Sequence, residues 1–359
     1  MREPVMKAKK RIKLGNRWVG DGEPVYIVAE LANNWDGEKD RARKLIDLAK
    51  DCGADAVKFQ SFNVDKLLSK RGCELLDPDR GLSLHKAIAA SSLPPEWHRE
   101  LFDYAKEKGL QCFSAPYDEE SVDLLVELDV PAIKIGSGEI DWFNRLKYIA
   151  KKGKPILMAT GTSTFAEIGA ALGIMRSVGH DKIVLLQCVT AYPSHFESAN
   201  IRAMVAMAEF FDVLVGYSDH TSRSSIVPLG AVALGACVIE KHFTDDHSRK
   251  GPGHSYSMDP TEFTAMVEGI RAMEKALGKP VRKIYSEEEP RAAFQRRCLR
   301  AAEDIPKGSK ITKQMIEALR PHVQDALTPG YEGFVVDRVT RVDLQKGDAI
   351  TWKRTRSPK

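Results

Sequence analysis

The stretch PAIKIGS, residues 131–137, is apolar along most of its length and carries a single lysine. Seven further runs of strand length occur between residue 25 and about residue 277, and each is followed by a segment with helical periodicity. Strands that are apolar throughout are typical of a parallel sheet covered on both faces. Eight βα units in about 250 residues therefore predict a (β/α)8 barrel. The runs are VYIVAE (25–30), DAVKFQ (55–60), LQCFS (110–114), PAIKIGS (131–137), PILMAT (155–160), IVLLQC (183–188), VLVGYS (213–218) and CVIEKHF (237–243).

An open, doubly wound α/β sheet is the alternative architecture. It is disfavoured because no Gly-x-Gly-x-x-Gly fingerprint follows the first run. After residue 280 the pattern changes, and two similar stretches, residues 304–312 and 343–351, predict a pair of β-turns in a small domain. We expect a basic N-terminal tail (1–20), a barrel domain (21–280), a linker (281–297), a small C-terminal domain (298–353) and a basic tail (354–359).

Composition and charge exclude several classes of protein. The 359 residues carry a net charge of +4, but residues 1–17 contribute +6 and the last seven residues +4, so the remainder is acidic. Solvated tails, rather than a nucleic-acid-binding surface, account for this distribution. No apolar stretch approaches the ~18 residues of a membrane span, and residues 1–18 are charged without the apolar run that is typical of a signal peptide, so membrane spanning and secretion are not expected. The six cysteines are spread singly, which is typical of a reducing cytoplasm.

Lys58 and Lys134 each lie within an apolar run, where an unpaired ammonium group is costly to desolvate. They belong to the second and fourth runs, and alternate strands of a barrel contribute to the same interior layer. We therefore expect both lysines to bind one phosphate or carboxylate ligand. Two alternatives remain open: internal ion pairs with Glu30 or Glu139, and a Schiff-base lysine whose pKa is lowered by burial.

Two histidines lie at the ends of the last two strands: His220 follows the seventh run by two residues, and His242 is the penultimate residue of the eighth. Neighbouring strands lie only ~4.8 Å apart, so both imidazoles can reach one ion. Two imidazoles without a thiolate suit a divalent metal with positions left for water or substrate. His247 and His254 follow in the next loop, and the sequence does not decide whether they line the site.

Five motifs together resemble the sialic acid (N-acetylneuraminate) synthase family of nonulosonic acid synthases: Glu30, KFQ (58–60), IKIGSGE (133–139), SDHT (218–221) and EKHFT (240–244). The C-terminal segment resembles the antifreeze-like (SAF) domain of that family. The resemblance implies condensation of phosphoenolpyruvate with an N-acyl mannosamine-type sugar aldehyde, which gives a nine-carbon 2-keto acid and inorganic phosphate. It also implies a cytoplasmic homodimer in which the SAF domain of one chain covers the barrel mouth of the other.

The resemblance assigns roles to individual residues. The divalent ion, most commonly Mn²⁺ with Mg²⁺ or Co²⁺ as alternatives, is held by His220 and His242. Phosphoenolpyruvate carries a phosphate and a carboxylate, which accounts for two lysines together with serine hydroxyls at one site. The expected catalytic residues are Glu30, Glu139, His220 and His242, without a decision on which glutamate handles protons. The expected substrate-binding residues are Lys58, Gln60, Lys134, Ser137, Thr190, Tyr192, Ser218, Phe294 and Arg320.

Several positions depart from the family pattern. Trp35 replaces a histidine, and Gly253 replaces an acidic sugar contact in Gly-Pro-Asp-His. Ala159 and Thr190 stand where a serine and an asparagine are common, and residues 322–326 replace a short Gly-x-Gly turn. These changes predict a modified acceptor, such as a 6-deoxy or differently acylated hexose. Two other functions remain open: a metal-dependent sugar aldolase, and a non-catalytic carbohydrate-binding relative.

Overall fold

The computed structural model describes residues 10–77, 81–89, 92–251 and 253–358. The chain divides into two compact units, Met1–Gly278 and Lys279–Lys359, which are described separately below. Residues 1–9 of the expected N-terminal tail and Pro252 of the Gly-Pro-Gly-His stretch lie outside the described residues. Among the described residues, no helix is long and apolar enough to cross a bilayer.

Within the described residues, unit 1 contains a closed barrel of eight parallel strands, which confirms the predicted fold. Each strand pairs with the next along the chain, and the last strand pairs with the first. All eight apolar runs of the sequence form strands because each is buried on both faces. The strands are β3 (Tyr26–Glu30), β4 (Ala56–Ser61), β5 (Gln111–Pro116), β6 (Ile133–Ile135), β7 (Ile156–Ala159), β8 (Ile183–Cys188), β9 (Leu214–Asp219) and β10 (Val238–His242).

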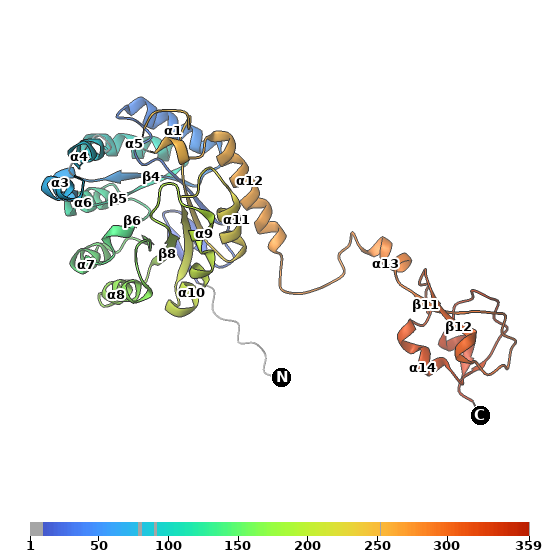
Figure 1. Cartoon of the computed structure of the whole chain (residues 1–359). Helices are drawn as coiled ribbons and strands as arrows, with labels where there is room; N and C mark the ends of the chain where they lie inside the picture. The colour runs from blue at the N-terminus through green and yellow to red at the C-terminus, as the bar shows by residue number, and fades with distance from the viewer. Residues whose placement is uncertain (1–9, 78–80, 90–91, 252, 359) are drawn as a thin grey trace. The chain divides into compact units, whose positions relative to one another are not determined.

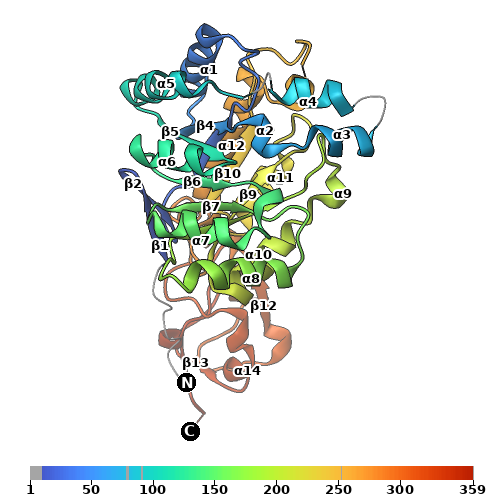
Figure 2. The ribbon, with the colours of Figure 1, turned by 90° about the vertical axis from the view of Figure 1, so that its left-hand side faces the viewer.

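Helices surround the strands, as Figures 1 and 2 show. The last of them, α12 (Pro260–Leu277), begins at a capping box in which Asp259 and Glu262 exchange hydrogen bonds. Its buried face includes Phe263 and Ile270, which pack in the core. The other covering helices are α1 (Lys39–Asp51), α5 (Pro95–Glu107), α6 (Glu119–Glu127), α7 (Phe143–Lys151), α8 (Phe165–Arg176), α10 (Ile201–Phe211) and α11 (Ile226–Ala233). Short helices α2 (Val64–Leu67), α3 (Lys70–Leu76), α4 (Gly81–Ala89) and α9 (Phe196–Ala199) lie in the loops.

The register of the strands brings polar residues together at the carboxyl ends of the barrel. His242 on β10 lies beside Glu30 on β3, and Glu30 lies beside Lys58 on β4. On the other side of β10, Glu240 lies beside Ser218 on β9, and Ser218 lies beside Cys188 on β8. Residues far apart in the sequence thus form one continuous band around the barrel mouth.

Residues 11–20, expected from their charge to form a solvated tail, instead form a hairpin of β1 (Arg11–Leu14) and β2 (Arg17–Gly20). The two-residue turn Gly15-Asn16 joins the strands, and this dipeptide is itself a hairpin signal. Leu14 and Val19 are fully buried, and the Gln111 side chain at the start of β5 donates to the Leu14 carbonyl oxygen. The hairpin therefore packs at the amino-terminal end of the barrel strands.

Unit 2 is a small domain with short antiparallel pairs. β11 (Cys298–Ala301) pairs with β12 (Ile316–Leu319), and β13 (Val339–Thr340) pairs with β14 (Thr355–Arg356). Its main core consists of a few residues: Leu299, Ile311, Leu327, Val335 and Ile350. Two elements lie outside the expected bounds of the domain, because α13 (Glu289–Gln295) occupies much of the expected linker and β14 lies in the expected C-terminal tail.

The two similar stretches of unit 2 pair with each other. Ile305 and Leu344 form an antiparallel bridge, with N–H···O distances of 2.7 and 2.9 Å in the two directions. Asp304 accepts from the Lys346 backbone N–H, and Asp343 accepts from the Lys307 backbone N–H. The predicted turns are present as well, since Gly308 and Gly347 both have φ of +88°. The repeat in the sequence is thus a symmetric pair of turns.

Candidate functional site

A pocket of about 190 Å³ opens at the carboxyl ends of the barrel strands. This is where (β/α)8 barrels carry their active sites. Most of the predicted site residues line it: Glu30, Lys58, Gln60, Lys134, Ser137, Thr190, Tyr192, Ser218, His220 and His242. Residues without a predicted role also line it, namely Ala115, Tyr117, Gly136, Gly138, Ala159, Cys188 and Glu240.

Glu240 is the centre of the charged cluster. Its carboxylate accepts from Lys134 Nζ at 2.7 and 2.8 Å, lies 3.4 Å from Lys58 Nζ and accepts from Ser218 Oγ at 2.9 Å. Lys58 also forms an ion pair with Glu30. All four charged side chains are at least 95% buried. The two predicted lysines do converge on one anionic group, and in this structure that group is a carboxylate of the protein.

Electrostatics in this cluster follow from burial and pairing. Burial lowers the pKa of Lys58 to about 7, although the Glu240 carboxylate opposes the change. Burial alone would raise the pKa of Glu240, but Lys134 and Lys58 together hold it below its usual value. The carboxylate therefore stays charged at neutral pH. Lys58, Lys134, Glu30 and Glu240 thus form one buried network of paired lysines and carboxylates.

Of the two carboxylates in the ion-pair alternative, Glu30 pairs with Lys58, whereas Glu139 pairs with neither lysine. Glu139 does not line the pocket; it forms an ion pair with Arg145 at 2.7 Å. Arg145 is itself buried and donates to the carbonyl oxygens of Pro116 and Tyr117. Burial raises the pKa of Glu139, and Arg145 opposes that shift. Glu139 thus helps to anchor the loop after β6 to the end of β5.

The two predicted metal ligands lie together, with ring centroids 5.3 Å apart. His220 Nδ1 donates to the Val189 carbonyl oxygen at 2.7 Å, which leaves Nε2 with a free lone pair. His242 Nδ1 is buried and has no hydrogen-bond partner among the described residues. Burial lowers the pKa of both imidazoles, and His220 and Lys58 lower that of His242 further. Neutral rings with unused lone pairs fit a divalent metal.

Tyr192 covers the histidine pair on the outer side of the pocket. Its ring centroid lies 4.3 Å from that of His220 and 5.8 Å from that of His242, and half of its surface is exposed. Gln60 follows the lysine of β4 by two positions, so it faces the same side of the strand. The two residues predicted to flank the sugar are therefore at the mouth of the pocket.

Hydroxyl groups line the wall near β6 and β7. The Gly161 backbone N–H donates to Ser137 Oγ at 3.1 Å. A Cβ atom on Gly161 would lie 2.8 Å from Ser137 Oγ and closer still to Thr190 Oγ1. Only glycine therefore leaves room for both hydroxyls, which makes Gly161 a site residue that no sequence motif had indicated.

Three other positions singled out in the sequence lie away from the pocket. Trp35 is buried, and its indole N–H donates to the Ala32 carbonyl oxygen. His254 is fully buried, with its Nδ1 2.7 Å from Thr244 Oγ1 and its Nε2 2.9 Å from Asp36 Oδ1. His247 lies within 4.8 Å of Asp259 and Glu262, the capping pair of α12. None of the three residues lines the pocket.

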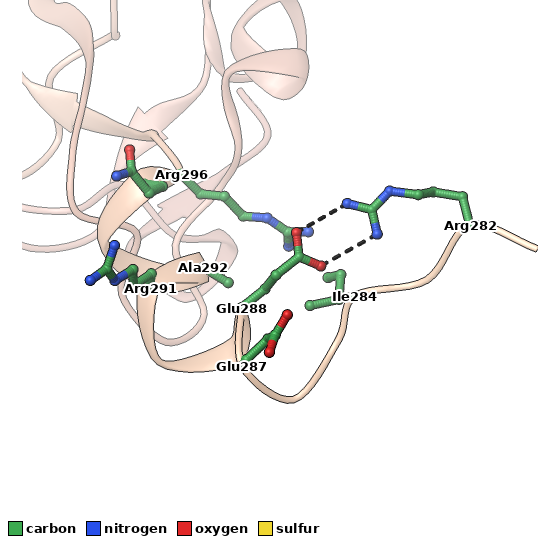
Figure 3. A pocket seen from close by; sticks show the side chains of 8 residues that line it. Arg282, Ile284, Glu287, Glu288, Arg291, Ala292 and Arg296 are labelled. Carbon is green, nitrogen blue, oxygen red and sulfur yellow. Dashed lines mark hydrogen bonds and ion pairs between the residues drawn. The ribbon is translucent and has the colours of Figure 1, made fainter. Parts of the chain in front are cut away.

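Phe294 and Arg320 belong to unit 2, on α13 and directly after β12, and both side chains are exposed. Neither lines the larger cavity of unit 2, which measures about 690 Å³ and is shown in Figure 3. That cavity has side chains of both charges, and an Arg282–Glu288 ion pair of 3.1 Å lies on its rim. Its charged side chains are exposed, apart from the partly buried Glu288, so it differs from the buried cluster of the barrel.

Together, the fold and the pocket define a (β/α)8-barrel protein with lysines, glutamates, hydroxyls and two histidines gathered at its carboxyl-terminal face. The NeuB family model matches residues 45–282 and the SAF domain model matches residues 296–355. The chain belongs to the NeuB family and ends in a SAF domain, which confirms the resemblance seen in the sequence.

Relatives of this chain bear the names of synthases. It is 35% identical to N,N'-diacetyllegionaminic acid synthase of Legionella pneumophila, over 93% of this chain and 95% of the relative. It is 34% identical to pseudaminic acid synthase of Campylobacter jejuni, over 91% of this chain and 95% of that relative. The crystal structure of N-acetylneuraminic acid (sialic acid) synthetase from Leptospira borgpetersenii, in complex with citrate, is 29% identical. The structural match covers 79% of this chain and 95% of the synthetase chain, with a TM-score of 0.71.

Proposed function

We propose that the protein condenses phosphoenolpyruvate with an N-acyl mannosamine-type sugar aldehyde to give a sialic-acid-like nonulosonic acid and inorganic phosphate. The observation that carries this proposal is the buried Lys58–Glu240–Lys134 cluster beside the His220–His242 pair. Family membership and the names of the relatives support the same reaction class.

Lys58 and Lys134 bind the anionic substrate in this proposal. Their ammonium groups already share the Glu240 carboxylate, so an entering phosphate or carboxylate replaces an interaction of the same chemical type. Ser137 and Thr190 add hydroxyl donors on the side of β6 and β8. Burial strengthens each of these interactions because competing water is excluded.

His220 and His242 would hold the divalent metal, for which Mn²⁺ is our first candidate. When bound, such an ion supplies Lewis-acid polarisation of the sugar aldehyde. The enol carbon of phosphoenolpyruvate then forms the new carbon–carbon bond with the aldehyde carbon. Water adds at C2, the C2–O bond to phosphate breaks, and the 2-keto acid and inorganic phosphate are released.

Glu30 is our candidate for handling protons and for holding sugar hydroxyls. Its Oε1 accepts from the Ala32 backbone N–H at 2.7 Å, and it lies beside His242 in the strand register. Glu139 is a weaker candidate, because it is paired with Arg145 and does not line the pocket. Gln60 and Tyr192 would contact the sugar at the mouth of the pocket.

We further propose a cytoplasmic homodimer in which Phe294 and Arg320 of one chain reach the sugar in the barrel of the other. Two observations support the proposal: both side chains are exposed, and the core of unit 2 is small. The six cysteines, all within the described residues, are free thiols, which agrees with a reducing compartment.

The proposed function is tested by incubating the protein with Mn²⁺, phosphoenolpyruvate and a panel of acceptors. The panel includes N-acetylmannosamine and diacetamido hexoses, because one relative makes a diacetylated product by name. Phosphate release is followed with a colorimetric assay, and the product mass identifies the acceptor. His242→Ala removes a proposed ligand, and exposed His195→Ala is the matched control.

We expect one mole of phosphate per mole of 2-keto acid, with loss of activity in His242→Ala only. Sugar cleavage or condensation without consumption of phosphoenolpyruvate would instead indicate the aldolase. Sugar binding without any product from the whole panel would indicate a non-catalytic relative.

A further inference from the structure

The tyrosines around the pocket differ from the other tyrosines of unit 1. Outside the pocket region, the hydroxyls of Tyr26, Tyr104, Tyr148 and Tyr217 each hydrogen-bond to a group of the protein, at 2.7 or 2.8 Å. Tyr117 lines the pocket, and no group within the described residues hydrogen-bonds its hydroxyl. A polar group at a pocket wall without a protein partner is available to a ligand.

Gly136, directly after β6, leaves space for the Tyr117 hydroxyl at this wall of the pocket. A Cβ atom on Gly136 would lie 3.0 Å from the Tyr117 hydroxyl oxygen, so the phenol would have to move by a few tenths of an ångström. Gly136 has φ of −70°, so its backbone does not itself require glycine. The missing side chain therefore makes room for the phenol. In the sequence Gly136 lies between Lys134 and Ser137, which line the same pocket and are proposed to bind the anion.

The chemistry of the phenol suits a hydrogen-bond donor. Burial raises the pKa of Tyr117, and the nearby Glu139 and Glu240 carboxylates raise it further, so the hydroxyl keeps its proton. Phe62 packs against the ring in a T-shaped arrangement, with centroids 5.8 Å apart, and fixes its orientation. A fixed, protonated hydroxyl loses little entropy when it binds an oxyanion.

We propose that the Tyr117 hydroxyl donates a hydrogen bond to the anionic substrate, on the β6 side of the pocket. This inference rests on the proposed function, since the anion it names is phosphoenolpyruvate. Tyr117 is then a substrate-binding residue that determines affinity for the anion and not for the sugar.

The test compares Tyr117→Phe with Tyr148→Phe. Both variants remove one hydroxyl, but Tyr148 lies on α7 and donates to Asp123 outside the pocket. Binding of phosphoenolpyruvate is measured by isothermal titration calorimetry, and the KM of each substrate is measured where turnover occurs. A hydrogen bond to a charged group predicts about tenfold weaker phosphoenolpyruvate binding in Tyr117→Phe. The sugar KM should not change, and Tyr148→Phe should match the wild type.

Gly136→Ala provides a second test that keeps the hydroxyl but displaces it. We expect weaker phosphoenolpyruvate binding in Gly136→Ala, and a smaller effect of the same change in a Tyr117→Phe background. The shortest contact, 3.0 Å to the hydroxyl oxygen, is lost there, and only the 3.3 Å contact to the ring carbon Cε1 remains tight. Equal phosphoenolpyruvate affinity in Tyr117→Phe and wild type would overturn the inference and leave the proposed function intact. Wild-type protein that binds phosphoenolpyruvate but releases no phosphate would overturn only the function. Absence of binding in the wild type would overturn both.

Discussion

Glu240→Gln removes the charge at the centre of the lysine cluster while keeping the shape of the side chain. Glu240 pairs with Lys134 at 2.7 Å and with Lys58 at 3.4 Å, and all three side chains are at least 95% buried. After the change, Glu30 remains as the carboxylate partner of Lys58. Lys134 is left beside a neutral amide, which accepts a hydrogen bond but does not neutralise it.

The size of the effect follows from the burial of the pair. Breaking a buried ion pair costs about 3–5 kcal/mol, because an uncompensated charge remains. Lys58 keeps Glu30 as its carboxylate partner in the variant. The unpaired charge is therefore that of Lys134 alone. We expect the free energy of unfolding to fall by about 3 kcal/mol, at the low end of this range.

The assay is urea denaturation at pH 7.5, followed by a signal from the barrel. Glu23→Gln is the matched control, because Glu23 pairs with Arg11 at 2.8 Å at a partly exposed site. That change should cost at most about 1 kcal/mol. Added phosphoenolpyruvate should recover more stability in Glu240→Gln than in wild type, because the anion takes the place of the carboxylate. A loss below about 1 kcal/mol in Glu240→Gln would refute the view that this carboxylate neutralises the lysines.

Three further predictions test other parts of the structure. The pKa of His242 is lowered in the folded state, so below about pH 6.5 the imidazole takes up a proton when the chain unfolds. The free energy of unfolding therefore decreases as the pH is lowered. Between pH 7.5 and 5.5, metal-free His242→Asn should lose about 1.4 kcal/mol less than wild type in urea denaturation, and exposed His195→Asn should lose the same as wild type. Mixing an Arg320→Ala chain with a His242→Ala chain should restore activity through hybrid dimers; mixed dimers without activity would contradict a lid acting in trans. Val19→Ala should lower the barrel melting temperature, at a cost of about 1–3 kcal/mol, because Val19 is fully buried; an unchanged melting temperature would mean that the hairpin is not part of the folded barrel.

The barrel was predictable from sequence because parallel strands in a barrel are buried on both faces. Continuous apolar runs of strand length, such as residues 183–188, are typical of this environment, and a lysine inside such a run is conspicuous. The hairpin of residues 11–20 was also within reach, through its Gly-Asn turn. Its many basic residues suggested a tail, but Arg11 and Arg17 are paired with Glu23 and Asp55.

Strand periodicity accounts for which site residues were found and which were missed. Glu240 and His242 are two residues apart on β10, so they face the pocket together. Lys241 faces the other way and pairs with Asp219 at 2.5 Å. The same alternation could have identified Glu240 beside His242. Glu139 does not line the pocket, because it follows the end of β6 in a 3-10 turn where strand alternation no longer applies.

The sequence by itself determined the (β/α)8 architecture, the two lysines and the two histidines, because each is a local signal of burial or of ligand chemistry. Only the tertiary structure decided which carboxylate meets the lysines. Glu240 lies 106 residues from Lys134, and barrel closure alone brings them to 2.7 Å. No local pattern encodes that pairing, because the register of strands on opposite sides of a barrel depends on how every strand between them packs.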